Sequence, residues 1–146
     1  MDLSRRRLAL GLAGLPLLGA AAPLAAQPSS LQFLFVGADD CEPCKRWHSN
    51  EGHWWKSSPE FSRVDTLFIT ARRTRHAFDD TYWPPHLRPI RDMPGAPRAT
   101  PAYFVMRNDQ LVLAAAGYTA WRREIYPALR EMVAAADPGR ALQARS

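Results

Sequence analysis

The chain has 146 residues, of which 47% are hydrophobic and five are Trp, and this is enough for one domain around one core. Its formal net charge is +5, but three arginines and one aspartate lie in residues 1–26, so residues 27–146 carry +3. No helical pattern carries a row of Lys and Arg with interleaved aromatic residues. Composition and charge therefore argue against nucleic-acid binding.

The first 26 residues predict an export signal. A basic group at residues 4–7 precedes a Gly- and Ala-rich apolar stretch, and a tolerable cleavage site lies at residues 24–26. The run SRRRLAL resembles a twin-arginine signal, although an ordinary secretory signal is an alternative. An uncleaved anchor is also open, because residues 8–26 approach the roughly 20 residues that span a bilayer. We expect cleavage, a periplasmic location and a single domain over residues 27–146.

Both cysteines lie in residues 31–47, LQFLFVGADDCEPCKRW. The apolar run at residues 31–36 ends in Gly and acidic residues, which predicts a strand buried on both faces. A helix should follow, with Asp40 as its N-cap and Pro43 in its first turn, where a missing N–H is tolerated. We expect this helix to continue to about Trp55.

The helix places the two cysteines differently. Cys41 would lie at the positive end of the helix dipole, where a thiolate is favoured over a thiol. The thiolate is the nucleophile of disulfide exchange. Cys44, one turn further along, would be placed to attack a mixed disulfide formed on Cys41.

The middle of the chain predicts a second buried strand and then a connection. Ser58 and Pro59 read as the start of a short helical turn, and residues 64–70 are β-branched and apolar enough for a strand. The two strands and the helix between them form a βαβ unit, with the cysteines at the carboxyl end of its first strand. Six of the 13 prolines lie between Pro84 and Pro101, so residues 71–100 should hold at most one short helical turn. The six arginines of this connection are predicted to form a solvated face.

The last third predicts a β-hairpin and a closing helix. Residues 102–107 and 110–116 are strands joined by a two-residue turn, and Gly117 ends the pair. Thr119 is the predicted N-cap of the closing helix, which Pro127 should kink or divide. The apolar stripe of this helix consists of Trp121, Ile125, Leu129, Met132 and Val133.

This order of elements resembles the thioredoxin superfamily over nearly all of residues 27–146. The resemblance rests on Cys41-Glu42-Pro43-Cys44 at the head of a helix and on Thr100-Pro101, where thioredoxin-like proteins carry a cis-proline beside the active cysteines. A Trp three residues after the second cysteine, Glu51, and the Gly-Tyr pair at 117–118 are more loosely similar to exported thioredoxins of bacterial sulfur oxidation. The implied fold is α/β, with a central mixed sheet of about four strands.

The resemblance implies a thiol-disulfide oxidoreductase of the reductase or isomerase type, without a cofactor or a metal. In this role Cys41 is the nucleophile, Cys44 resolves the mixed disulfide, and Thr100 with Pro101 offers backbone to a bound substrate strand. The implied partners are protein disulfides or dithiols and a membrane electron donor.

Two positions depart from the thioredoxin pattern. Thioredoxins usually carry Trp immediately before the first cysteine, and here that residue is Asp40. They also keep a buried Asp six residues before that cysteine, as a proton relay for the second thiol, and here that residue is Phe35. Deprotonation of Cys44 would then depend on another group or on water.

Two other readings of the cysteine pair are open. A static disulfide over so short a loop would contribute only about 2 kcal/mol in the loop-entropy model, against about 4.7 kcal/mol for a hundred-residue loop. Alternatively, Cys41 and Cys44 could bind copper or zinc together with His48, with His53 as a further candidate ligand, as in a metal carrier.

The residues around Cys41 also predict a redox potential. Glu42, Asp39 and Asp40 add negative charge beside the sulfur, and no basic residue lies between the cysteines to offset them. The reduced form is then not strongly stabilised, so we expect a reducing potential of roughly −200 to −270 mV.

Overall fold

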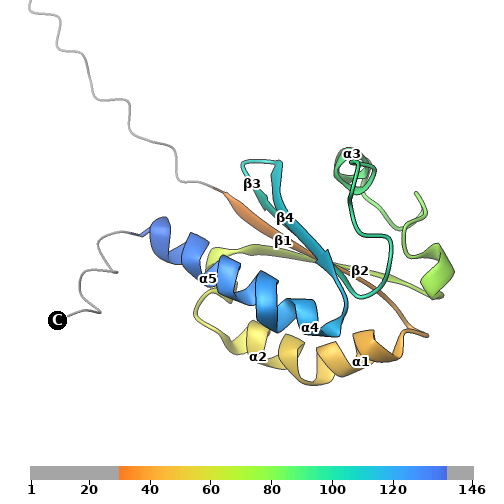
Figure 1. The fold of residues 1–146 in the computed structure, drawn as a ribbon, viewed down its shortest axis with the longest axis horizontal. Coiled ribbons are helices and arrows are strands. Elements are labelled where there is room, and N and C mark those ends of the chain that lie inside the picture. Colours follow the sequence, from red (N-terminus) through yellow and green to blue (C-terminus); the bar gives the residue numbers. More distant parts are fainter. Residues whose placement is uncertain (1–29, 138–146) are drawn as a thin grey trace, which may run out of the picture.

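The structure is a computed structural model that describes residues 30–137 (Figure 1). The predicted export signal at residues 1–26 lies outside the described residues. Within residues 30–137, no helix has both the length and the apolar character that crossing a membrane requires.

A mixed sheet of four strands forms the centre of the fold, in the order β2-β1-β3-β4. Strand β1 pairs in parallel with β2 and antiparallel with β3, and β3 pairs antiparallel with β4. The strands are β1 (Leu31–Ala38), β2 (Asp65–Ala71), β3 (Ala102–Arg107) and β4 (Gln110–Ala116). This order and these directions are those of the thioredoxin fold, which confirms the predicted fold class.

The turn between β3 and β4 is the predicted two-residue turn. Asn108 and Asp109 both have positive φ angles, 51° and 62°. Two such residues give a turn whose twist matches the flanking strands, and Asn and Asp tolerate this conformation better than most side chains. Local turn chemistry therefore sets the register of the hairpin.

The prediction of a single helix after the cysteines is wrong in one respect. The structure has two helices there, α1 (Glu42–Ser49) and α2 (Glu51–Ser57). The break lies at Asn50, whose ψ of −80° departs from helical geometry. It brings the backbone of Gly52 against the indole of Trp47, where an added Cβ would lie 2.6 Å from a ring carbon. Ser58 ends α2 by donating its hydroxyl to the Trp55 carbonyl, so the next turn begins later than predicted, at Phe61–Arg63.

The closing helix is divided, as the sequence predicted. It consists of α4 (Tyr118–Ala120), a π-helical turn (Trp121–Ile125) and α5 (Tyr126–Ala135), with Pro127 in the first turn of α5. Thr119 is not its N-cap, because the helix already begins at Tyr118 behind Gly117, whose φ is +99°.

Helices α1, α2, α4 and α5 cover one face of the sheet, and the core lies between them and the sheet (Figure 1). The ring of Phe33, at the centre of β1, lies 5.3–6.5 Å from the rings of four other aromatic residues, and all of them are buried. Offset and edge-to-face contacts of this kind add to the free energy of burial. The four are Trp47, Trp55, Tyr103 and Trp121.

The connection between β2 and β3 lies on the opposite face of the sheet (Figure 1). It holds three short helical turns rather than one: Thr74–His76, Pro85–Leu87 and α3 (Arg88–Arg91). Prolines occupy early positions of the second and third turns, where the absent N–H has no helical partner to lose.

Arg91 contradicts the prediction that all the arginines of this connection are solvated. Arg91 is only 7% exposed. Its guanidinium donates to the carboxylates of Asp80 and Asp92 at 2.6 and 2.8 Å and to the Phe78 carbonyl at 2.9 Å. It also lies over the ring of Trp83. Arg91 therefore holds separate parts of the connection together as a buried, paired cation.

Candidate active site

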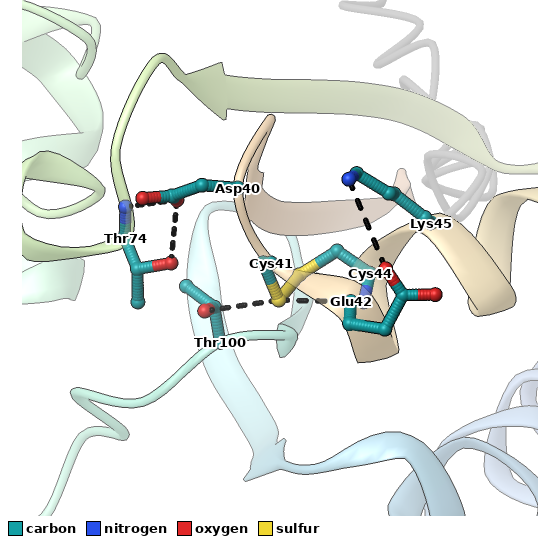
Figure 2. The surroundings of a disulfide bond; sticks show 7 residues. All are labelled: Asp40, Cys41, Glu42, Cys44, Lys45, Thr74 and Thr100. Carbon is teal, nitrogen blue, oxygen red and sulfur yellow. Dashed lines mark hydrogen bonds and ion pairs between the residues drawn. A yellow bond between two sulfur atoms is a disulfide. The ribbon is translucent and has the colours of Figure 1, made fainter.

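The two cysteines lie just beyond the carboxyl end of β1, where α1 begins, and they form a disulfide (Figure 2). The predicted N-cap was wrong by one residue. Cys41 itself is the N-cap, and its sulfur accepts a hydrogen bond from the backbone N–H of Cys44 at 3.3 Å. The positive end of the helix is thus directed at the Cys41 sulfur, as the sequence predicted.

The burial of the two cysteines differs in the expected direction. Cys41 is 5% exposed and Cys44 is 1% exposed. Cys44 packs against Gly37, where an added Cβ would lie 3.1 Å from the Cys44 sulfur and 2.7 Å from a ring carbon of Phe35. Only glycine fits at position 37 without displacing one of these side chains. Of the two cysteines, Cys41 is the more exposed.

Thr100 and Pro101 lie beside Cys41 although 59 residues separate Thr100 from it in the sequence. The Thr100 hydroxyl donates a hydrogen bond to the Cys41 sulfur at 3.3 Å (Figure 2), and the Thr100-Pro101 peptide bond is cis, as expected. The Pro101 carbonyl accepts from the N–H of Gly117 at 2.8 Å. The structure therefore brings the predicted nucleophile and the predicted substrate-binding residues together.

The carboxylate of Asp40 is directed away from the helix and toward the loop after β2 (Figure 2). It accepts hydrogen bonds from the backbone N–H and the hydroxyl of Thr74, at 2.7 and 2.8 Å. These bonds hold the pKa of Asp40 below its usual value, and the guanidinium of Arg73, 3.8 Å away, acts in the same direction. Asp40 is therefore ionised at neutral pH.

A buried carboxylate lies two helical turns beyond Cys44, and the sequence analysis gave it no chemical role. Glu51 is 6% exposed and bonds the guanidinium of Arg122 at 2.6–2.7 Å and the hydroxyl of Tyr118 at 3.3 Å. Burial, with the Glu51 charge as a second cause, raises the pKa of the neighbouring Tyr103. A signal for Glu51 was present, because its spacing from Cys44 puts it on the buried side of the helix.

The position of the usual relay carboxylate is apolar, as the sequence indicated. Phe35 is fully buried, and its ring lies 4.3 Å from the ring of Trp47 in a stacked arrangement. Within residues 30–137, Glu51 and Arg91 are the charged residues that are buried.

The histidines proposed as metal ligands make other contacts. The ring of His48 packs on Phe35 and Phe68 at 4.7 and 5.8 Å, and burial lowers its pKa. The ring of His53 lies near that of Trp54. Among the described residues, no three side chains of His, Cys, Asp or Glu form a group that could hold a metal ion.

Fold and site agree with each other. A Cys-x-x-Cys pair heads a helix, beside a cis-proline that precedes a β-hairpin, on a sheet of order β2-β1-β3-β4, and this arrangement is that of the thioredoxin fold. Among solved structures, the chain is similar to the periplasmic thioredoxin SoxS from Paracoccus pantotrophus in its reduced form. The two share 20% identity over 71% of this chain and 96% of that chain, with a TM-score of 0.49. No family model and no curated protein matches the sequence.

Proposed function

We propose that the protein is a thiol-disulfide oxidoreductase that works through Cys41 and Cys44. The observation that carries the proposal is the environment of the Cys41 sulfur. It accepts from the Cys44 N–H at the head of α1 and from the Thr100 hydroxyl, each at 3.3 Å. Two donors and a helix N-terminus favour the negative charge that an attacking or leaving thiolate carries.

Reduction of a substrate takes two exchange steps. The Cys41 thiolate attacks one sulfur of a substrate disulfide, a Cys41–substrate bond forms, and the other substrate sulfur leaves as a thiolate and takes up a proton. The Cys44 thiolate then attacks the Cys41 sulfur, and the first substrate sulfur leaves in turn. Two electrons have passed from the dithiol to the substrate, and the protein retains the Cys41–Cys44 disulfide.

The substrate strand is proposed to lie against Thr100 and Pro101. Pro101 is buried immediately before β3, and its carbonyl accepts a hydrogen bond from the Gly117 N–H, so this backbone is held in place beside Cys41. An extended substrate segment that adds to this backbone would bring its disulfide to the Cys41 sulfur.

The direction of electron flow and the location are also proposals. The acidic residues beside Cys41 support a reductase or isomerase over an oxidase. The basic and apolar pattern of residues 1–26 supports export to the periplasm. A reductase in an oxidising periplasm needs electrons from a donor in the membrane, so we propose such a donor as the second partner.

The order of attack is tested by trapping. Cys44→Ser leaves the first step intact and removes the second, so it should accumulate mixed disulfides with proteins of a periplasmic extract. Cys41→Ser should accumulate few, because the remaining sulfur is the more buried one. Non-reducing electrophoresis and mass spectrometry would measure both variants. Equal trapping by the two variants, or none by Cys44→Ser, would contradict the proposal.

A further inference from the structure

The turn that carries Cys41 is bonded to the loop that follows β2. The backbone N–H of Asp39 donates to the Ala71 carbonyl at 2.9 Å, and the Asp40 carboxylate accepts twice from Thr74 at 2.7 and 2.8 Å. Arg73 adds an ion pair at 3.8 Å. We call the two bonds from Thr74 to the Asp40 carboxylate the Asp40 clasp.

The clasp depends on the carboxylate rather than on general contact. One carboxylate oxygen of Asp40 accepts from both Thr74 donors. Asp40 also lies immediately before Cys41 in the chain, so these bonds act directly on the turn that carries Cys41. Hydrogen bonds to an ionised acceptor are stronger than neutral ones, and a backbone donor holds the partner loop in one register. A lone surface ion pair would contribute little, so the hydrogen bonds to Thr74 are the important part.

We infer that Asp40 is a positioning residue for disulfide exchange: its carboxylate fixes the Cys41 turn against the loop after β2, and its charge opposes ionisation of the Cys41 thiol. The inference rests on the proposed function and adds a residue to it. It gives the position that is Trp in thioredoxins a polar role in this chain. The clasp and the charge are separable, because an amide can keep the first and remove the second.

The other charges near Cys41 are partly offset. Glu42 forms an ion pair with Lys45 at 3.8 Å, and both side chains are exposed. Among the described residues, the Asp39 side chain has no hydrogen bond or ion pair. It is a carboxylate of the same size, one position further from Cys41 in the sequence. Asp39 therefore provides the matched control.

The clasp is tested by Asp40→Ala against Asp39→Ala. Asp40→Ala should abolish the hydrogen-exchange protection of the Thr74 amide, and the rate of exchange with a small disulfide, expressed per Cys41 thiolate, should fall about fivefold. Asp39→Ala should retain both. Thr74→Val keeps the carboxylate and the backbone donor but loses the hydroxyl, so an intermediate rate is expected. If Asp40→Ala matches Asp39→Ala in protection and in rate, the positioning role is contradicted.

The charge is tested by Asp40→Asn, whose amide oxygen can still accept from Thr74. The acid dissociation constant of Cys41 in the reduced protein, measured from the pH dependence of alkylation, should rise about threefold, because a negative charge near the sulfur is removed. Thr74 protection should stay at the wild-type level. An unchanged dissociation constant would overturn the electrostatic part.

These readouts also separate the inference from the proposed function. If wild-type protein exchanges disulfides no faster than free cysteine, the proposed function fails, while Thr74 protection and the dissociation constant still test the role of Asp40. If Asp40→Ala does not fold, Asp40→Asn and Thr74→Val still decide the charge and the clasp.

Discussion

The Cys41 sulfur accepts one local and one long-range hydrogen bond. The local bond comes from the first turn of its own helix, and the other comes from Thr100, which lies 59 residues later and just before β3. The helical contribution follows from local sequence and was predicted. The Thr100 contribution depends on tertiary structure, and only the family resemblance pointed to it.

Replacing Thr100 by Val tests the second of these bonds. Val has nearly the same shape and lacks the hydroxyl donor, so the thiolate of Cys41 loses about 0.5–1.5 kcal/mol of stabilisation. The acid dissociation constant of the Cys41 thiol should therefore fall by about twofold to about thirteenfold in the reduced protein. Alkylation rates between pH 5 and 10 would measure this.

Thr66→Val is the control for that substitution, because Thr66 is half-buried in β2 and, within residues 30–137, its hydroxyl bonds the Val64 carbonyl alone, at 3.4 Å. It should leave the dissociation constant of Cys41 unchanged. A Thr100→Val protein that behaves like Thr66→Val would show that the hydroxyl does not stabilise the thiolate.

The Glu51–Arg122 pair joins two helical elements behind the site. Glu51 belongs to α2 and Arg122 to the π-helical turn, and their side chains are 8% and 71% exposed. The guanidinium of Arg46 lies over the ring of Tyr118, which also bonds Glu51. The pair therefore holds α2 and the start of the closing helix together at Gly117 and Tyr118, next to the proposed substrate backbone.

Because Glu51 is buried and Arg122 is exposed, removing the arginine should lower the stability of the fold. Arg122→Met leaves the Glu51 carboxylate buried without its cation, so we expect a lower free energy of unfolding, with a smaller loss than for a fully buried pair because Arg122 is exposed. Arg123→Met is the control, since Arg123 is exposed and has no ion pair among the described residues. Urea unfolding would compare them. Equal stability of the two variants would mean that the pair contributes nothing.

At the scale of elements, the sequence predicted best what local chemistry decides. The apolar run of β1 and the Asn108-Asp109 turn follow from residue type and spacing alone, and both were confirmed. The break at Asn50 was missed, because it depends on the fit of Gly52 to Trp47 rather than on a breaking residue. The burial of Arg91 was missed for a similar reason, since its partners Asp80, Phe78 and Trp83 come from other parts of the connection.

For the whole molecule, the sheet order explains why the candidate site assembles where it does. Strand β1 lies between β2 and β3, so the segment after β1, the loop after β2 and the segment before β3 meet at one edge of the sheet. Cys41, Thr74 and Thr100 come from these three segments and are bonded to one another or to Asp40 (Figure 2). The Cys pair and the Thr-Pro pair could be predicted from sequence, whereas the Asp40–Thr74 contact required the arrangement of all three segments.

The measurement that tests the central claim most directly is the redox equilibrium of the Cys41–Cys44 disulfide with glutathione. Protein equilibrated at pH 7 in buffers of defined reduced and oxidised glutathione is quenched with acid, and its thiols are counted by mass spectrometry. A redox-active pair in an acidic environment predicts reversible exchange with a potential of roughly −200 to −270 mV. A pair that does not exchange would contradict the oxidoreductase assignment, and a potential above about −150 mV would contradict the reductase assignment and indicate an oxidase.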